Sequence, residues 1–296
     1  MAEIGAGLVF LSGKLLPLEE ARVPVLDRGF IFGDGVYELV PVYSRVPFRL
    51  DEHLARLERS LGEAKIRNPY TRAQWQDIIY RLVDAQPFED QGVYFQVTRG
   101  VAKRDHAFPK GVEPTVFMMA NPLVTPPREL VEQGAAAVSA QDNRWLRCDI
   151  KTISLIGNCL LRQVSAEAGA AETILFRDGK LTEASASNVF AVRRGVILTP
   201  PKSNLILPGI TYDVITELAQ ANALPLEARD VQEAEVRGAD EIWLTSSSKE
   251  VLAVVMLDGC QVGDGRPGPV FARMYQLYQE FKQKVMRAGK REAVSA

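Results

Sequence analysis

Residues 147 to 158 read RCDIKTISLIGN and place one lysine, Lys151, inside an otherwise nearly apolar run. Burying an ammonium group is costly, and the pKa of a buried lysine shifts readily. The lysine either lies at a strand end and extends its amine to water, or it is kept for its chemistry. The rest of the chain decides between these two interpretations.

Composition excludes several classes of function. The 296 residues suffice for a large core and two domains. The 35 basic and 37 acidic residues nearly cancel, so we expect neither nucleic acid nor an anionic membrane as a partner. No apolar stretch approaches the roughly 18 residues of a membrane span. Three cysteines without metal-ligand spacing predict a reducing, cytoplasmic location, and two histidines are too few for a histidine-rich metal site.

The first 122 residues predict a small domain of mixed strands and helices. Two strands joined by a Ser-Gly turn come first, followed by a loop over 26–35 and a hairpin over 36–50. Two further strands are expected over 92–100 and 114–121.

Two amphipathic helices are predicted between these strands. Asp51 is the expected cap of the first, and its shared face is formed by Leu54, Leu57, Leu61 and Ala64. Thr71 is expected to begin the second, whose apolar stripe is formed by Trp75, Ile78, Ile79, Leu82 and Val83.

A proline-rich stretch, NPLVTPPREL, follows this region, and we expect residues 123–129 to be a linker to a second domain over 130–296. Residues 172–200 predict a strand, an Asp-Gly turn, a loop, a strand, an Arg-Gly turn and a strand. A helix is expected over 211–223, and residues 241–257 read as strand, polar loop and strand.

The segment LPGIT, residues 207–211, precedes the predicted helix. The backbone N–H groups of Ile210 and Thr211, with the Thr211 hydroxyl, would form an anion site favoured by the helix dipole. A simple helix cap is the alternative interpretation.

Two more polar loops lie in the second half of the chain. LTSSSKE, residues 244–250, offers Ser246 and Ser247 as donors to phosphate oxygens, or it is an ordinary polar loop. TEASASNVF, residues 182–190, places Glu183 before small residues that let a ligand approach the backbone. The alternative is a solvated carboxylate in a hairpin loop.

A reactive lysine, a carboxylate and an anion site at a helix start are the parts that pyridoxal 5′-phosphate needs. The blocks that carry a specific resemblance are FGDGVYE, EHLARL, YFQVTRG, RWLRCDIK, TEASASNVF, LPGIT and LTSSS. In order and spacing they are similar to the fold-type IV pyridoxal-phosphate enzymes, over about residues 7 to 284. Within that superfamily the chain most resembles the D-amino acid transaminases, also called D-alanine transaminases.

The resemblance implies roles for single residues. Lys151 would form the Schiff base with the cofactor, and Glu183 would keep the pyridine nitrogen protonated. Leu207 would pack beneath the ring. The phosphate would be held by Arg56, Ile210, Thr211, Ser246 and Ser247. The run of three serines in the second phosphate loop is a minor departure from the family pattern.

Substrate choice rests on RGVAKRDHAFP, in which Arg104 and His106 are two residues apart. On an extended segment both side chains point the same way and converge on one anion; the alternative is a solvated basic loop. The resemblance implies that this pair, with Tyr37, binds the substrate α-carboxylate. In that family the pair comes from the partner subunit, which implies a homodimer.

The resemblance also implies the fold and the reaction. We expect the α+β, two-domain fold of type IV, with a small N-terminal α/β domain, a larger C-terminal mixed, barrel-like β domain with helices, and the cofactor in the cleft between them. The expected activity is ping-pong transamination between a D-amino acid such as D-alanine and a 2-oxo acid such as 2-oxoglutarate. A branched-chain L-amino acid aminotransferase, an aminodeoxychorismate lyase, and a pyridoxal-phosphate-binding protein without turnover remain alternatives. The first two would lack Arg104 and His106 as a carboxylate trap.

Overall fold

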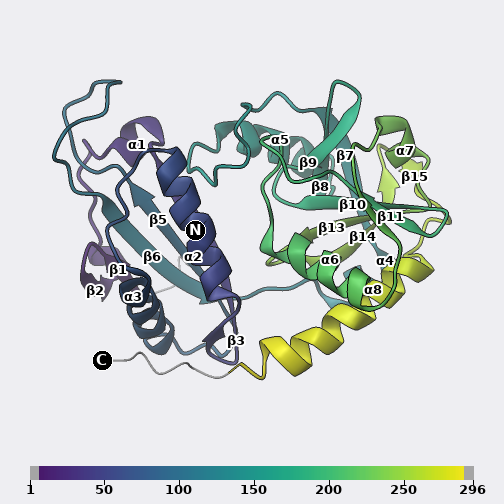
Figure 1. The fold of residues 1–296 in the computed structure, drawn as a ribbon, viewed down its shortest axis with the longest axis horizontal. Coiled ribbons are helices and arrows are strands. Elements are labelled where there is room, and N and C mark those ends of the chain that lie inside the picture. The colour runs from purple at the N-terminus through teal and green to yellow at the C-terminus, as the bar shows by residue number, and fades with distance from the viewer. Residues whose placement is uncertain (1–6, 290–296) are drawn as a thin grey trace. The chain divides into compact units, whose positions relative to one another are not determined.

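The computed structural model of the chain describes residues 7–289 (Figure 1). The chain divides into two compact units. Unit 1 comprises Met1–Leu123, Ile150–Leu155 and Val285–Ala296, and unit 2 comprises Val124–Asp149 and Ile156–Lys284. Each unit contains one sheet and its helices, so the predicted α+β class is confirmed.

Unit 1 contains a six-stranded sheet in the order β2-β1-β6-β5-β3-β4. All its neighbouring strands are antiparallel. The strands are β1 Leu8–Leu11, β2 Lys14–Pro17, β3 Gly35–Tyr43, β4 Val46–Pro47, β5 Gln91–Thr98 and β6 Thr115–Pro122. The predicted hairpins and the last two strands are therefore present.

The helices of unit 1 are η1 Leu18–Glu20, α1 Arg28–Phe32, α2 Leu50–Glu63 and α3 Arg72–Asp84. The prediction for α3 is confirmed, because Thr71 and Gln74 form a capping box and all five residues of the stripe are buried. The prediction that Asp51 caps α2 is wrong: the helix begins at Leu50 and its N-cap is Arg49, two residues before the predicted cap. Asp51 lies in the first turn, where its charge still favours the helix dipole.

Residues 26–35, expected to be a loop, contain the short helix α1. Its N-cap is Asp27, whose side chain accepts a hydrogen bond from the Gly29 N–H at 2.8 Å. The helix ends at Gly33, which has φ of 65°. A Cβ atom at Gly33 would lie 2.6 Å from Ser154 Oγ, so glycine is needed here for space as well as for conformation.

The core of unit 1 lies between α2, α3 and the sheet. It includes Leu54, Leu57 and Leu61 of α2, Trp75 and Leu82 of α3, and Val36, Val40, Val93 and Phe95 of the strands. Burial of each such side chain stabilises the fold by about 1.5–3 kcal/mol relative to exposure. This packing fixes α2, which carries His53 and Arg56, against β3, which carries Tyr37 and Glu38.

Unit 2 contains a mixed sheet in the order β12-β11-β10-β13-β14-β7-β8-β9, with β15 paired to β14. Three neighbouring pairs are parallel, β11 with β12, β14 with β7 and β7 with β8. Its strands are β7 Ala135–Gln141, β8 Glu172–Arg177, β9 Lys180–Ala184, β10 Asn188–Arg193, β11 Val196–Thr199, β12 Leu226–Ala228, β13 Glu241–Ser246, β14 Glu250–Leu257 and β15 Cys260–Gln261. Residues 172–200 form four strands and not the predicted three, because the segment with Glu183 pairs with β8 as β9.

The helical segments assigned mainly to unit 2 are α4 Arg128–Gln133, α5 Ile156–Glu167, α6 Ile210–Ala221, α7 Glu233–Arg237, α8 Pro269–Phe281 and η2 Lys282–Met286. α6 is the helix predicted after LPGI, and in Figure 1 it lies beside α8. α5 was not predicted. Its apolar residues Ile156, Leu160 and Val164 are 74%, 64% and 42% exposed, so they form an uncovered stripe along one side of the helix.

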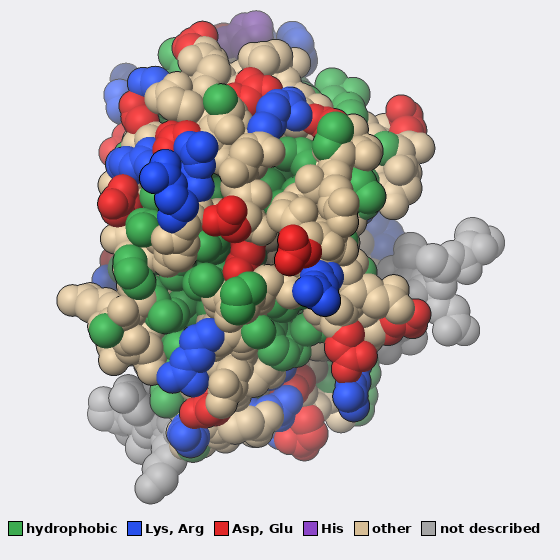
Figure 2. Space-filling model, turned by 90° about the vertical axis from the view of Figure 1, so that its right-hand side faces the viewer, with side chains coloured by type: hydrophobic (Ala, Val, Ile, Leu, Met, Phe, Trp, Pro, Cys, Tyr) green, Lys and Arg blue, Asp and Glu red, His purple; other side chains and the backbone are tan. Residues whose placement is uncertain are grey.

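The charged residues on the face of the molecule drawn in Figure 2 are mostly interspersed by sign, with apolar side chains between them. This face therefore offers no long basic stripe of the kind that nucleic acid would require. Within residues 7–289, none of the helices is both long enough and apolar enough to cross a membrane.

Candidate active site

Lys151 is fixed to β3 and α2 of unit 1 through its backbone. The Tyr37 N–H donates a hydrogen bond to the Lys151 carbonyl at 2.8 Å, and the Lys151 N–H donates to Ser60 Oγ at 3.3 Å. The next residue, Thr152, forms a β-bridge with Val36 and donates to the Gly35 carbonyl at 3.1 Å. The lysine is therefore held in place although it lies outside the regular strands.

The side chain of Lys151 packs on an aromatic ring. Its Nζ lies 4.2 Å from the centroid of the Tyr37 ring, a cation–π distance. By contrast, Lys202 pairs with Asp213 at 2.5 Å, and Lys249 pairs with Glu172 at 3.3 Å. Among the residues that the structure describes, the Lys151 amine makes no ion pair, so it is the least committed of these three lysines.

A buried ionic cluster lies beside this lysine in unit 1. Arg56 binds Glu38 through two parallel hydrogen bonds, Nε to Oε1 at 2.8 Å and Nη2 to Oε2 at 2.7 Å. His53 Nδ1 lies 2.9 Å from Glu38 Oε2. Glu38 and His53 are fully buried and Arg56 nearly so. The predicted phosphate-binding residue is thus oriented by a carboxylate that the sequence did not reveal.

The cluster shifts the pKa values of its members. Burial opposes ionisation of Glu38, but Arg56 and the hydrogen bond to His53 hold the pKa of this carboxyl well below its ordinary value. Burial lowers the pKa of His53, and the charges of Arg56 and Lys151 act in the same direction. His53 is therefore expected to be neutral, and its buried Nε2 has no hydrogen-bond partner in the described residues.

Glu183 is a buried residue of β9 in unit 2. Its Oε1 accepts a hydrogen bond from Arg144 Nη1 at 2.7 Å. Its Oε2 accepts from the Leu207 N–H at 3.0 Å and from Asn188 Nδ2 at 3.3 Å. Burial raises the pKa of Glu183 to about 7, although Arg144 and the Leu207 N–H act to lower it. The alternative of a solvated loop carboxylate is therefore wrong.

Arg144 is a functional candidate that the sequence reasoning missed. Its Nε and Nη2 each donate to an oxygen of Asp142 at 2.9 Å, while Nη1 reaches Glu183. This places the guanidinium between two carboxylates, and together they hold the pKa of Arg144 above its ordinary value against the effect of burial. A usable signal was present, because Arg144 begins the RWLRCDIK block and follows Asp142 by two residues.

The segment before α6 is tied to the same network. The Leu207 carbonyl accepts from Asn188 Nδ2 at 3.0 Å, and a Cβ atom at Gly209 would lie 2.2 Å from Asn188 Oδ1. Gly209 is the N-cap of α6 and provides no side-chain cap, so the first N–H groups, on Ile210 and Thr211, remain available to an anion. The structure thus brings Glu183, Leu207 and the start of α6 together.

The second predicted anion loop follows β13. Thr245 lies opposite Asn188 in the register of β10 and β13, so Ser246 begins the loop next to the same network. Ser246 Oγ accepts a hydrogen bond from the Lys249 N–H at 3.1 Å. Ser247 is half-buried in the turn that leads to β14.

Arg104 and His106 lie on an exposed loop of unit 1 that bends and is not a regular strand. Both nevertheless pack on Phe32 of α1: the Arg104 guanidinium carbon lies 5.4 Å, and the His106 ring centroid 5.4 Å, from the centroid of that ring. Arg28 supports the loop by donating to the Asp105 carbonyl. Arg104 and His106 are therefore brought together on the Phe32 ring. Tyr37, the third residue predicted to bind the carboxylate, packs instead against the ring of Tyr94.

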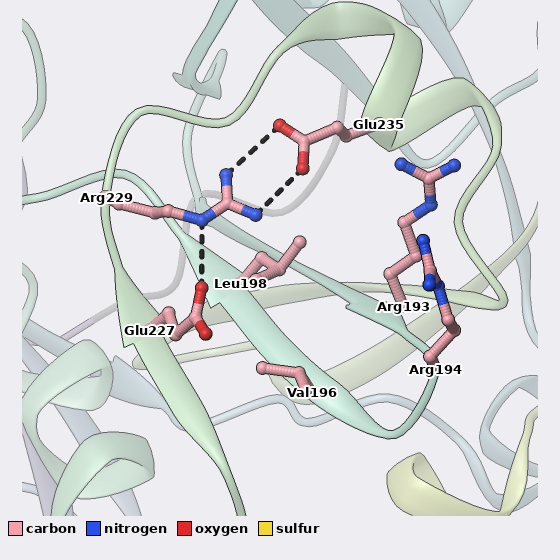
Figure 3. A pocket seen from close by; sticks show the side chains of 7 residues that line it. All are labelled: Arg193, Arg194, Val196, Leu198, Glu227, Arg229 and Glu235. Carbon is pink, nitrogen blue, oxygen red and sulfur yellow. Dashed lines mark hydrogen bonds and ion pairs between the residues drawn. The ribbon is translucent and has the colours of Figure 1, made fainter.

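A pocket of about 340 Å³ in unit 2 contains none of the predicted site residues (Figure 3). On one wall Arg229 binds Glu235 through two hydrogen bonds and Glu227 through a third. The remaining lining residues are Arg193, Arg194, Val196 and Leu198. This pocket is therefore separate from the predicted cofactor residues.

Comparison with known proteins identifies the family. Residues 35–257 match the family model described as amino-transferase class IV, which is most of the chain. The chain is 41% identical to "D-alanine aminotransferase" of Bacillus licheniformis over 88% of this chain and 92% of that protein. It is 38% identical to "D-alanine aminotransferase" of Listeria monocytogenes over 95% of this chain and 96% of that protein. The chain belongs to the class IV aminotransferases, whose cofactor is pyridoxal 5′-phosphate.

Solved structures share the fold. A branched-chain amino acid aminotransferase of T.th. with pyridoxamine 5′-phosphate has a TM-score of 0.87 at 26% identity, and the match covers 94% of each chain. A branched-chain aminotransferase of Thermoproteus uzoniensis with norvaline has a TM-score of 0.84 at 26% identity, over 96% of this chain and 97% of that one. The predicted fold of type IV is confirmed.

Proposed function

We propose that this chain transfers the amino group of D-alanine to a 2-oxo acid with pyridoxal 5′-phosphate as its cofactor. The observation that carries this proposal is its likeness to D-alanine aminotransferases, at 36% to 41% identity over about nine tenths of the chain. The proposal assigns cofactor-binding roles to Lys151 and Arg56 of unit 1 and to Glu183, Leu207 and the two anion loops of unit 2.

Three features of the described residues suit this cofactor. Lys151 has an amine without an ion pair, as a lysine that must react with an aldehyde requires. Glu183 is a buried carboxyl with a pKa of about 7, which suits a partner for a pyridine nitrogen. The start of α6 has no side-chain cap, which suits a phosphate. When bound, pyridoxal 5′-phosphate withdraws electron density from the substrate Cα and makes its proton acidic.

Lys151 is assigned two tasks. Its amine holds the cofactor in the resting enzyme and, when substrate has taken its place, removes the Cα proton and returns it as a general acid. Contact with the Tyr37 ring limits the positions that the amine can occupy. Glu183 keeps the pyridine nitrogen protonated, and the hydrogen bonds from Arg144 and the Leu207 N–H fix the direction of its carboxyl group.

Phosphate binding is assigned to several donors. Glu38 fixes the plane of the Arg56 guanidinium by two hydrogen bonds, so this side chain loses little rotamer freedom when it meets an anion. The remaining donors come from Ile210, Thr211, Ser246 and Ser247. Because several donors share the phosphate, we expect each single replacement to weaken cofactor binding only in part. The preoriented guanidinium should make Arg56→Ala more damaging to cofactor retention than Ser247→Ala.

Binding of the substrate carboxylate is assigned to Tyr37, Arg104 and His106, with the last two supplied by a second copy of the chain. Their shared exposed position over Phe32 is compatible with that role. The uncovered apolar stripe of Ile156, Leu160 and Val164 supports a homodimer, because monomers rarely leave such a helix face in water. The cytoplasmic location and the domain boundaries at residues 122 and 130 stay predictions.

The test is a half-reaction. Purified protein loaded with pyridoxal 5′-phosphate should release pyruvate when D-alanine is added, with conversion of the bound cofactor to its amine form in the absorption spectrum. A protein that binds the cofactor without turnover would show neither change. The likeness to branched-chain aminotransferases favours one other substrate class, so L-valine is the matched comparison. Faster reaction with L-valine than with D-alanine would overturn the proposal.

A further inference from the structure

A further buried carboxylate, Glu172 at the start of β8, lies outside the proposed cofactor contacts. It is fully buried, and its Oε1 accepts hydrogen bonds from the Ala186 N–H at 3.0 Å and from Ser187 Oγ at 2.9 Å. Its Oε2 accepts from the Thr173 N–H at 3.1 Å and from Ser185 Oγ. Lys249 Nζ lies 3.3 Å from Oε1 and is the cation of the group.

Three of these donors lie in the segment after β9, the strand that carries Glu183, and Lys249 lies in the turn that carries Ser246 and Ser247. Residues 185–187 follow directly on β9, which ends one residue after Glu183. Lys249 closes the turn that begins with Ser246, and its own N–H donates to Ser246 Oγ at 3.1 Å. Ser246 Oγ also lies 3.5 Å from Ser248 Oγ, and the rotatable Ser246 hydroxyl can turn from this long contact to donate to an anion.

One carboxylate therefore joins the segment after β9 to the turn after β13. An ionised Glu172 without its ammonium partner would be a buried negative charge held by neutral donors alone, which is an unfavourable state. Loss of Lys249 would then release the turn after β13 from the segment after β9. The resulting shift would fall on the phosphate donors and not on Lys151.

We propose that the Glu172–Lys249 ion pair is a positioning device for the phosphate loop at Ser246 and Ser247. Neither residue touches the reacting atoms, and the inference rests on the proposed function. The pair gives Lys249 of the LTSSSKE segment a positioning role.

The test compares Lys249→Met with Lys249→Arg and with a control, Lys180→Met. Lys180 forms an exposed ion pair with Asp230 at 2.6 Å in the same unit. Apoenzyme of each variant is dialysed to equilibrium against pyridoxal 5′-phosphate, and its melting temperature is recorded. We expect Lys249→Met to raise the dissociation constant of the cofactor by about tenfold to a hundredfold, with kcat at saturating cofactor close to that of the wild type. Lys249→Arg should restore most of the affinity, and Lys180→Met should leave it unchanged.

An unchanged dissociation constant in Lys249→Met, or an equal loss in Lys180→Met, would overturn the inference. Glu172→Gln is a second variant, expected to show the same loss of affinity if it folds; Lys249→Met decides the matter if it does not. Wild-type protein that retains the cofactor and converts D-alanine separates the two proposals: with that result, an unaffected Lys249→Met refutes the positioning role alone. Wild-type protein that fails to bind the cofactor refutes both.

Discussion

Two buried glutamates, one in each unit, each pair with an arginine, but their pKa values are shifted in opposite directions. Glu38 of unit 1 and Glu183 of unit 2 are both removed from water and both bind an arginine. The pKa of Glu38 lies well below its ordinary value of 4.5, whereas burial raises the pKa of Glu183 to about 7.

The difference follows from how each arginine is shared. Arg56 gives Glu38 two parallel hydrogen bonds, and His53 lies within hydrogen-bonding distance of the same carboxylate. Arg144 gives Glu183 one hydrogen bond and directs its other two to Asp142. Glu38 is therefore a permanent anion that orients Arg56, while Glu183 keeps a proton within reach near neutral pH. The number of charged hydrogen bonds, more than burial itself, separates an anchor from a group suited to proton exchange.

The largest loss of activity is expected on replacement of Lys151, which pairs with neither glutamate. Lys151→Ala removes both the cofactor anchor and the general base, so transamination of D-alanine should fall by about 10³–10⁴-fold or more. The fold should survive, because the backbone contacts of Lys151 to Tyr37 and Ser60 need no side chain. Steady-state rates measure the loss of transamination, and circular dichroism tests whether the fold is retained. Activity within tenfold of the wild type would contradict this assignment.

Glu38→Gln should cost the most stability. It leaves the buried Arg56 guanidinium without its anion, and breaking a buried pair in this way destabilises a protein by about 3–5 kcal/mol. Glu58→Gln is the matched control, since Glu58 binds Arg72 through two hydrogen bonds on the exposed side of α2. Urea unfolding should show a large decrease in the free energy of unfolding for Glu38→Gln and almost none for Glu58→Gln. Equal decreases would contradict the special role of the buried pair.

Glu183→Gln should act on turnover. A neutral amide cannot hold the pyridine nitrogen protonated, and loss of such an electrostatic contact costs about 10²–10³-fold in kcat. Cofactor binding should be less affected, because the phosphate donors are unchanged. Unaltered kcat in Glu183→Gln would refute the role of this residue.

The pKa of Glu183 also predicts how the apoenzyme responds to pH. With a folded-state pKa of about 7 against an ordinary value of 4.5, the folded protein retains a proton that the unfolded chain has lost. The contribution of Glu183 to the free energy of unfolding is thus fully present below pH 4.5 and is lost as pH rises toward about 7, by about 3–4 kcal/mol at most. Glu183→Gln should abolish this decline. The pKa of Glu38 is shifted in the opposite direction, so Glu38→Gln should leave this decline in stability unchanged.

The smallest effects should fall on substrate binding. Arg104→Leu removes one charge-assisted contact to a carboxylate, worth about 1.5–3 kcal/mol, so KM for D-alanine should rise by about one to two powers of ten. His106→Ala should do so more mildly. Initial rates over a range of D-alanine concentrations measure both, and an unchanged KM in Arg104→Leu would exclude the carboxylate trap.

Local signals made much of the fold predictable, and long-range contacts explain most of what was missed. The capping box of α3 joins Thr71 to Gln74, so the sequence displays it directly. α5 was missed although Ile156, Leu160 and Val164 recur at helical spacing, and β9 was missed because buried polar residues such as Glu183 replace the apolar alternation of a strand. Arg144 reaches Glu183 across 39 positions, and Arg56 reaches Glu38 across 18. Such pairs are decided by sheet register and helix packing, which no short motif encodes.

The identity of the cofactor lysine is the most direct test of the account. Protein loaded with pyridoxal 5′-phosphate is reduced with borohydride, digested, and its labelled peptide sequenced by mass spectrometry. We expect the label on Lys151, whose amine makes no ion pair in the described part of the chain. A label on Lys202 or Lys249, which are bound to Asp213 and Glu172, would contradict it.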